Sequence, residues 1–404
     1  MIKPRLKHLR HPLRTAAAAK EHIGHYCEIL GLGDRYGRLY RGDARYDLAA
    51  VSNGFAARLS DSDKDEEMLE RICAAYGCAI ERGRSTAKIY EASSWWQRER
   101  GTALGPVLRA LEERDIKALG WMYRNFFRDP CSTGLTGVPF GMSKAYFAGK
   151  IKDIHRRFYL GEALRSIDHW KRQTCGRFLL SELEGPDIGN PFGAVVDGIL
   201  VRAGAAFQHH SAQRIARCLC SETATVVEIG GGYGGMAYYL LRDCLGMTYI
   251  DFDVPESLAL ASYYLMKSLP HLRFLLYGES DLSVETLSRC DVALMPLFAI
   301  ESLAGGSADV VFSSHAMSDI SSEAMETYQG VIARITRGAF LYAGNSQGAE
   351  SIIESTLGGK HLFRLQEMRP SGWNAHRYAK EDEVECLFEP VTARNAPMCV
   401  VQEK

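Results

Sequence analysis

The sequence predicts an α/β protein with a helical amino-terminal region followed by a mainly parallel, helix-covered sheet. Before residue 190, apolar residues recur at helical spacing, and beyond it short β-branched runs alternate with amphipathic segments. A repeated strand–helix–strand order is typical of parallel sheets. Chain breakers at Gly189-Asn190-Pro191 indicate a boundary. We therefore expect a helical domain over 1–190 and an α/β domain over 191–404.

The helical region is predicted from spacings of three and four residues. Leu104, Leu108, Leu111, Leu119, Met122 and Phe126 follow this spacing and would form one face of a long amphipathic helix. The neighbouring pair Trp95-Trp96 is expected in the core of this domain.

Seven strands are predicted in the second half, at 225–229, 247–252, 272–277, 309–313, 339–343, 363–368 and 398–402. Helices are expected over 235–243 and over Pro255–Ser268, where the missing amide hydrogen of Pro255 costs nothing in the first turn. Ligands of such sheets bind beyond the carboxyl ends of the strands.

Composition excludes several classes of protein. The 404 residues are 46% hydrophobic and 24% charged, which excludes wholesale disorder. No apolar run approaches the ~18–20 residues of a membrane span, and a net charge of −1 disfavours a nucleic-acid binder. Eleven scattered cysteines cannot all pair and lack zinc-site spacing. We expect a cytoplasmic protein with free, mostly buried thiols and no metal.

The first 20 residues carry six basic side chains and no acid. We expect a solvated basic arm or first helix there. A transit peptide and a helix resting on an anionic membrane surface are the alternatives.

The segment from Val226 to Gly235 carries the chemistry. A buried strand runs into a glycine-rich turn, and the turn opens a helix whose free amide hydrogens face the ligand. Asp251 and Asp253 end the next strand, about 20 residues on, where a carboxylate can grip a ribose. The alternative is that one of these acids caps the following helix.

Two patterns fit the turn. Gly230-x-Gly232-x-x-Gly235 matches the dinucleotide fingerprint. Glu228-x-Gly230-x-Gly232-x-Gly234 resembles the first motif of class I S-adenosylmethionine (SAM)-dependent methyltransferases. SAM carries an ammonium group and no pyrophosphate, so an acid at Glu228 would attract SAM and repel a dinucleotide. This favours SAM over a nicotinamide cofactor.

A narrower resemblance follows from longer stretches. Glu228 to Gly235, Tyr249-Ile-Asp-Phe-Asp-Val-Pro-Glu256, Gly189-Asn190-Pro191-Phe192-Gly193 and Asp309 to Ser318 resemble a family of bacterial sugar O-methyltransferases. The likeness covers roughly residues 90 to 380. It implies a Rossmann-like SAM-methyltransferase sheet and a sugar or glycan acceptor, in a surface polysaccharide, a glycolipid or a sugar nucleotide.

The resemblance also implies roles for single residues. Glu228 and the backbone of Gly230, Gly232 and Gly234 would hold the methionine end of SAM. Asp253 would bind the ribose, with Asp251 as its rival, and Glu279 would lie near the adenine at the end of the third strand.

Methyl transfer to an alcohol needs a base, because alcohols are poor acids. His315 is the first candidate, with Asp319 and His376 as alternatives. One of His209 and His210 could contact the acceptor, Trp373 could cover the apolar face of a sugar, and Arg377 or Arg369 could bind an anionic group.

The sequence therefore predicts a SAM-dependent O-methyltransferase acting on a sugar. The alternatives are a natural-product methyltransferase, an NAD-dependent oxidoreductase and an inactive SAM-binding module. The helical half would cover the acceptor site or support a homo-oligomer. The acids do not have a spacing that demands a metal.

Overall fold

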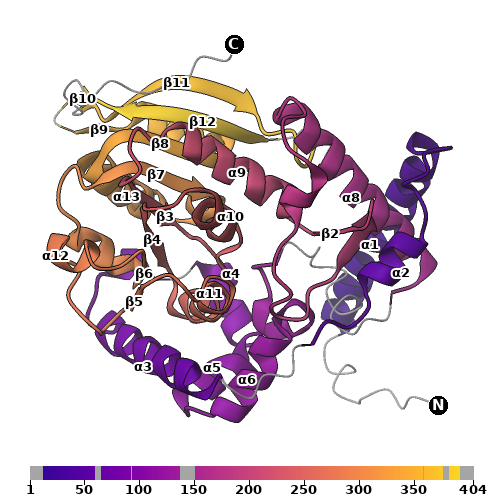
Figure 1. Cartoon of the computed structure of the whole chain (residues 1–404), viewed down its shortest axis with the longest axis horizontal. Coiled ribbons are helices and arrows are strands. Elements are labelled where there is room, and N and C mark those ends of the chain that lie inside the picture. Colours follow the sequence, from indigo (N-terminus) through magenta and orange to yellow (C-terminus); the bar gives the residue numbers. More distant parts are fainter. Residues whose placement is uncertain are drawn as a thin grey trace.

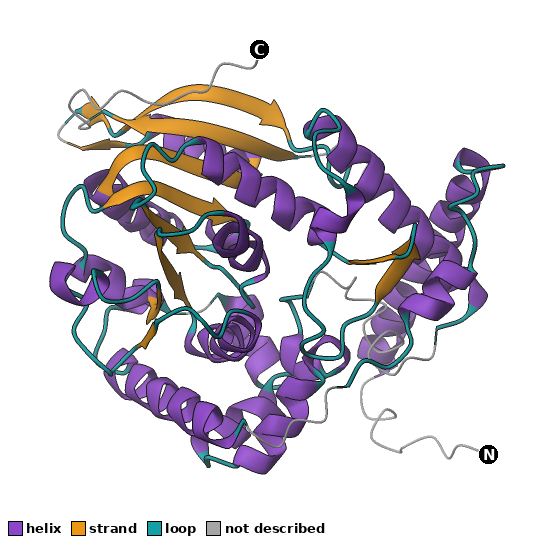
Figure 2. Cartoon of the chain, viewed as in Figure 1, coloured by secondary structure: helices purple, strands orange, loops and turns teal. Residues whose placement is uncertain are grey.

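The structure is a computed structural model that describes residues 12–59, 65–91, 93–136, 151–357, 359–375 and 382–391. The first half of this described chain is built from helices (Figures 1 and 2). They are α1 (Pro12–Leu39), α2 (Ala49–Gly54), α3 (Glu66–Gly83), α4 (Ser94–Arg100), α5 (Gly105–Glu112), α6 (Ile116–Arg124) and α8 (Asp153–Gln173), with 3-10 turns η2 (Lys88–Tyr90), η3 (Phe126–Arg128), η4 (Pro130–Ser132) and η6 (Leu180–Leu183).

The predicted long helix over 104–126 is wrong, because the chain breaks between α5 and α6. Arg114 lies in the left-handed region, with a φ of 53°, which a continuing helix cannot contain. Asp115 then caps α6 by accepting a hydrogen bond from the amide of Ala118 at 3.0 Å. The apolar residues still recur at helical spacing across the break because α5 and α6 both bury their apolar residues in one core.

The central sheet has eight strands in the order β11-β12-β8-β7-β3-β4-β6-β5. They are β3 (Thr225–Ile229), β4 (Thr248–Asp253), β5 (Phe274–Leu276), β6 (Val292–Pro296), β7 (Ala308–Ser314), β8 (Thr336–Asn345), β11 (Phe363–Pro370) and β12 (Glu383–Pro390). Strands β3 to β8 run parallel to one another, and β12 runs antiparallel to both of its neighbours, β8 and β11. The α/β class with a mainly parallel sheet is confirmed.

The predicted count of seven strands is wrong for the described chain. β6 is buried along its whole length and shows no alternation of polar and apolar residues. β12 contains Glu383, Glu385 and Glu389, which suggest an exposed segment, although most of the strand is buried. The predicted strand at 398–402 lies outside the described residues.

Alternate residues of the strands enter two different cores. Val226 and Val310 face a large core shared with α9 (Ala205–Arg217), α10 (Gly235–Asp243) and α11 (Pro255–Ser268). Val227 and Val311 face a second core with α13 (Ser322–Ile335) and α14 (Ser346–Glu354). Both faces of the sheet are therefore covered, as expected for parallel strands.

The smaller elements complete the chain: α12 (Val284–Leu287), the 3-10 turns η7 (Leu297–Ser302) and η8 (Ala316–Asp319), and the hairpins β1 (Gly193–Val196) with β2 (Ile199–Arg202) and β9 (Thr356–Leu357) with β10 (Lys360–His361). Helix α11 spans the residues that its sequence pattern predicts.

The helical region packs directly on the sheet region. α3 lies against α11, and the large core includes residues from α1, α3, α5, α6 and α8 as well as from the sheet. The division of the chain at residue 190 stays a prediction. None of the described helices has the length and apolar character that a membrane span requires.

The described cysteines form no disulfide, in agreement with the expectation of free thiols. They are not mostly buried, because Cys27, Cys78, Cys175 and Cys220 are exposed.

Candidate active site

A cavity of about 480 Å³ lies where the carboxyl ends of β3, β4 and β7 meet, with the residue after β6 in its wall. β3 is the switch point of the sheet, since its two neighbours, β4 and β7, both follow it in the chain on opposite sides. Open α/β sheets bind their ligands at such a point. We call this space the glycine-turn cavity.

The turn after β3 needs glycine at three positions. Gly230, Gly232 and Gly234 have φ values of 82°, 63° and 84°, in the left-handed region that side chains disfavour. A Cβ on Gly230 would also collide with that of Ala316. The bare backbone therefore lets two loops approach each other at the cavity.

Two acids near the end of β4 accept hydrogen bonds from the backbone of this turn. The amide of Gly231 donates to Asp251 at 3.0 Å, and the amide of Gly232 donates to Asp253 at 2.8 Å. Of these two acids, Asp253 lines the cavity and Asp251 does not. Asp251 is 1% exposed, and its Oδ2 has no hydrogen-bond partner in the described structure. Asp253 also accepts from the amide of Val254, the residue before α11, at 2.6 Å. This contact lies outside the first turn of the helix.

Glu228 adds a third buried acid beside these two. It lines the cavity and accepts a hydrogen bond from the hydroxyl of Tyr249. Burial raises the pKa of Glu228 to about 8 and that of Asp253 to about 7, and burial together with the neighbouring acids raises the pKa of Asp251 well above its usual range. A cationic ligand would stabilise the charged forms of these acids, whereas a phosphate would disfavour them.

The amino-terminal half supplies another wall of the same cavity. Trp96, which was expected in the core, lines the cavity together with Gly134 and Leu135. A Cβ on Gly134 would stand 2.6 Å from the ring of Trp95, so glycine allows this close packing. The cover of the site thus comes from residues distant in sequence from the glycine turn.

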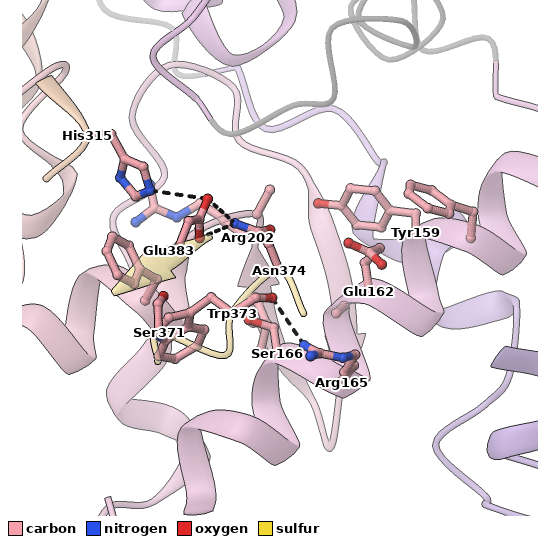
Figure 3. Close-up of a pocket in the computed structure, with 16 residues that line it drawn as sticks. Tyr159, Glu162, Arg165, Ser166, Arg202, His315, Ser371, Trp373, Asn374 and Glu383 are labelled. Carbon is pink, nitrogen blue, oxygen red and sulfur yellow. Dashed lines mark hydrogen bonds and ion pairs between the residues drawn. The ribbon is translucent and has the colours of Figure 1, made fainter. Parts of the chain in front are cut away.

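A second cavity has a volume of about 220 Å³, and Figure 3 shows the residues that line it. Gly204, Phe207 and His315 line both. Its other walls combine rings with polar side chains, among them Tyr159, Glu162, Arg165, Ser166, Trp373, Asn374 and Glu383. We call it the aromatic cavity.

His315 lies at the junction of the two cavities, directly after β7. Its φ of 63° is unusual for a residue with a side chain, and such strain concentrates at functional sites. The conformation is held by a 2.7 Å hydrogen bond from its amide to the carbonyl of Ala343. The imidazole contacts Ser314 Oγ through Nδ1 at 2.8 Å and Glu383 Oε1 through Nε2 at 3.6 Å.

Trp373 forms a wall of the aromatic cavity, as the prediction of an acceptor contact requires. Its Nε1 donates to Glu385 at 3.0 Å. Glu385 also accepts from Arg214 at 2.8 Å and from Arg369 at 3.0 Å. Burial would raise the pKa of Glu385, but His210, Arg214 and Arg369 around it lower it to about 2. Arg369 therefore already has a carboxylate partner.

The structure brings neither His209 nor His210 to either cavity. His209 is fully buried and its Nδ1 accepts from Trp170 Nε1 at 3.1 Å. Burial lowers its pKa to about 4, which keeps it neutral. Arginine can only donate, so Nε2 of His210 accepts from Arg369 at 3.1 Å. Both histidines face packed elements rather than an acceptor.

Glu279 also lies away from the glycine-turn cavity. β6 stands between β4 and the edge strand β5, so the segment after β6, and not the one after β5, reaches the cavity. Glu279 instead forms an ion pair with Arg71 and accepts from the amide of Leu276 at 2.8 Å. The sequence pattern does not predict β6 and so places β5 next to β4, which is why Glu279 was expected near an adenine.

Three other candidates stay open. Asp319 is the last residue of η8, which follows His315. His376 and Arg377 lie outside the described residues. Within the described residues, no cluster of three or more His, Cys, Asp or Glu side chains could hold a metal ion.

Glu383, Asn374 and Phe207 are among the cavity residues that sequence reasoning did not assign. Glu383 follows no motif, and only the pairing of β12 with β8 brings it near His315. Phe207 and Asn374 stand next to the histidine pair and Trp373 in sequence, but nothing in those patterns says which side chain faces the cavity.

No protein-family model and no curated protein sequence matches this chain. Among solved structures, it is similar to the pyocyanin biosynthetic protein PhzM (13% identity, 46% of this chain, 56% of that chain, TM-score 0.31). It is also similar to the [4+2]-cyclase SpnF (13%, 47% and 83%, TM-score 0.34). A third is geranyl diphosphate C-methyltransferase from Streptomyces coelicolor A3(2), in complex with Mg2+, geranyl diphosphate and S-adenosyl-L-homocysteine (8%, 45% and 78%, TM-score 0.33). The matched region spans little more than half of PhzM. Likenesses this low carry no argument about activity.

Proposed function

We propose that this protein is a class I SAM-dependent methyltransferase that transfers a methyl group to a hydroxyl of a sugar. One observation carries the proposal: His315 lines both the glycine-turn cavity and the aromatic cavity. Methyl transfer requires donor and acceptor to meet in line at one point, next to a group that takes a proton. A base between two cavities meets this requirement.

The glycine-turn cavity fits SAM better than a dinucleotide. Glu228 and Asp253 are buried acids in its wall. Burial raises their pKa values, and a cation beside them would favour their charged forms. SAM carries an ammonium and a sulfonium, and it supplies an electrophilic methyl carbon. The pyrophosphate of NAD would instead meet negative charge.

Roles for the cavity residues follow from their positions. Glu228 and the backbone of Gly230, Gly232 and Gly234 would hold the methionine end of the cofactor. Asp253 would accept hydrogen bonds from the ribose hydroxyls. Asp251 stabilises the glycine turn by accepting a hydrogen bond from the amide of Gly231.

The aromatic cavity suits a sugar ring. Trp373 and Phe207 pack edge to face, with centroids 5.5 Å apart, and offer apolar surface for the C–H face of a sugar. Asn374, Ser166 and Glu383 lie among these rings and can bind hydroxyls. His315 would take the proton of the reacting hydroxyl.

A two-stage experiment tests this proposal. Titration calorimetry with SAM and with NAD⁺ should detect SAM binding alone; NAD⁺ binding alone would establish the oxidoreductase alternative. Transfer from [methyl-¹⁴C]SAM is then measured on methyl glycosides of neutral hexoses, deoxyhexoses and uronic acids, and on sugar nucleotides. Incorporation into a glycoside supports a sugar acceptor. Phenolic natural products are assayed in parallel, and incorporation into them alone would favour the other methyltransferase class. No incorporation into any acceptor would leave an inactive SAM-binding module.

A further inference from the structure

Glu383 is the one carboxylate within ion-pair distance of His315 among the described residues. It is the first residue of β12, lines the aromatic cavity, and has its Oε1 3.6 Å from Nε2 of His315 (Figure 3). Nδ2 of the Asn374 side chain donates to both carboxylate oxygens of Glu383, at 3.1 and 2.9 Å. The carboxylate is thus held from one side and faces the imidazole on the other.

The backbone of Glu383 is fixed on both sides. It pairs with Asn345 of β8, and its carbonyl accepts from the amide of Ser371 at 2.9 Å. His315 is fixed by its own bond to Ala343 of β8. Both residues are therefore anchored to the same strand of the sheet, which sets the separation of their side chains.

The other charged side chains that line the aromatic cavity have partners elsewhere. Arg165 donates to the carbonyls of Gly372 and Trp373, at 3.0 and 3.1 Å. Arg202 contacts the hydroxyl of Tyr264 at 3.3 Å. Glu162 accepts from the hydroxyl of Tyr36. Among the charged side chains of this cavity, Glu383 is the one within ion-pair distance of the His315 ring.

We propose that Glu383 is a positioning residue for methyl transfer, an inference that rests on the proposed function. In that step the acceptor oxygen forms a bond to the methyl carbon. The carbon–sulfur bond breaks, and its electron pair stays on sulfur. The hydroxyl proton moves to the imidazole of His315, and the Glu383 carboxylate stabilises the positive ring.

The distance supports a role in charge stabilisation and orientation. At 3.6 Å, Nε2 and Oε1 are too far apart for a good hydrogen bond, yet close enough for a strong interaction once the ring is charged. The Glu383 carboxylate therefore stabilises His315 most strongly once the imidazole has taken up the hydroxyl proton. A group of this kind lowers the barrier without tightening the binding of either substrate.

Glu383→Gln tests the inference, because glutamine keeps the shape of the side chain and removes its charge. The assay is ¹⁴C-methyl transfer to the best glycoside acceptor of the panel above. We expect kcat to fall about 10- to 100-fold, with the KM of the acceptor and the Kd of SAM each within about threefold of wild type. Glu383→Asp, which keeps the charge, should recover part of the loss.

A matched control comes from the same strand. Glu389 lies in β12, pairs with Arg364 at 3.6 Å and does not line either cavity, so Glu389→Gln should leave kcat unchanged. Wild-type turnover in Glu383→Gln, or a higher KM at unchanged kcat, would overturn the inference alone. Wild-type protein that methylates no acceptor in the panel would overturn the proposed function, and this inference with it.

Discussion

The indole of Trp373 donates to Oε1 of Glu385, while Arg214 and Arg369 donate to its other carboxylate oxygen. The aromatic wall of one cavity is thereby tied to a buried ion cluster. Glu385 is 2% exposed and belongs to β12, two residues beyond Glu383 on the same face of the strand. The strand thus presents one acid to His315 and another to Trp373.

Replacing Glu385 with glutamine should be strongly destabilising. The change leaves the guanidiniums of Arg214, whose side chain is 13% exposed, and of Arg369, which is 33% exposed, without the buried carboxylate that they share. Both keep a longer contact with Glu367, so we expect a loss of roughly 1.5–3 kcal/mol. Urea denaturation measures the free energy of unfolding. Trp373→Phe is the control, because it removes one neutral donor and should cost about 1 kcal/mol. Equal losses in the two variants would contradict the importance of the ion cluster.

The affinity for SAM should increase with pH. Glu228 and Asp253 have pKa values raised to about 8 and about 7, so both are largely protonated at pH 5.5. As the pH rises through 7 and 8 they become anions that attract the cationic cofactor. We expect calorimetry to show about 10-fold tighter binding at pH 8 than at pH 5.5. Glu228→Gln should bind SAM more weakly at pH 8 and with a smaller pH dependence.

The same acids should make the ligand-free protein less stable at high pH. Their folded pKa values lie above the unfolded values, near 4, so the native state retains protons that the unfolded state loses. The free energy of unfolding should therefore fall as pH rises from about 4.5 to 8. Glu228→Gln removes one contributor and should flatten this dependence, whereas an unchanged slope would contradict the assignment.

The parts of the site that lie in one sequence segment could be predicted. The turn after β3 follows from glycines at Gly230, Gly232 and Gly234, whose positive φ angles no other residue tolerates as well. The helix from Pro255 follows from a proline in its first turn. In both places the local chemistry determines the backbone without help from distant residues.

The parts that depend on the order of strands could not be predicted. Glu279 follows β5, and only the insertion of β6 beside β4 removes it from the cavity. Which face of α9 is buried decides that His209 packs against Trp170, and helical periodicity alone leaves this open. The contact of His315 with Glu383 exists because β12 pairs with β8, a non-local event.

Gly230→Ala should damage both folding and cofactor binding. Alanine at a φ of 82° is strained, and its Cβ would collide with Ala316. We expect thermal and urea denaturation to show a loss of roughly 2–4 kcal/mol in the free energy of unfolding, and calorimetry to show no SAM binding.

Gly77→Ala is the matched control for that substitution. Gly77 lies inside α3, and a Cβ there meets nothing within 4 Å. The change should therefore stabilise the protein by roughly 0.5–1 kcal/mol, since alanine favours helix more than glycine does. If both alanine variants behaved alike, the special geometry of the turn would be in doubt.

Substitutions of His315 separate its chemistry from its backbone strain. His315→Ala and His315→Gly both remove the imidazole, but only glycine adopts a φ of 63° without cost. Turnover of the glycoside acceptor should fall about 100-fold or more in both variants, with SAM affinity little changed. The glycine variant should unfold at a higher urea concentration than the alanine variant.

Added imidazole provides the decisive measurement on these variants. The space left by the side chain opens to both cavities, because His315 lines each of them. Free imidazole at millimolar concentration should therefore enter, accept the proton of the hydroxyl and restore part of the turnover in His315→Gly. It should have no effect on wild-type protein. Full turnover in the variant without imidazole would transfer the role of base to Asp319 or His376.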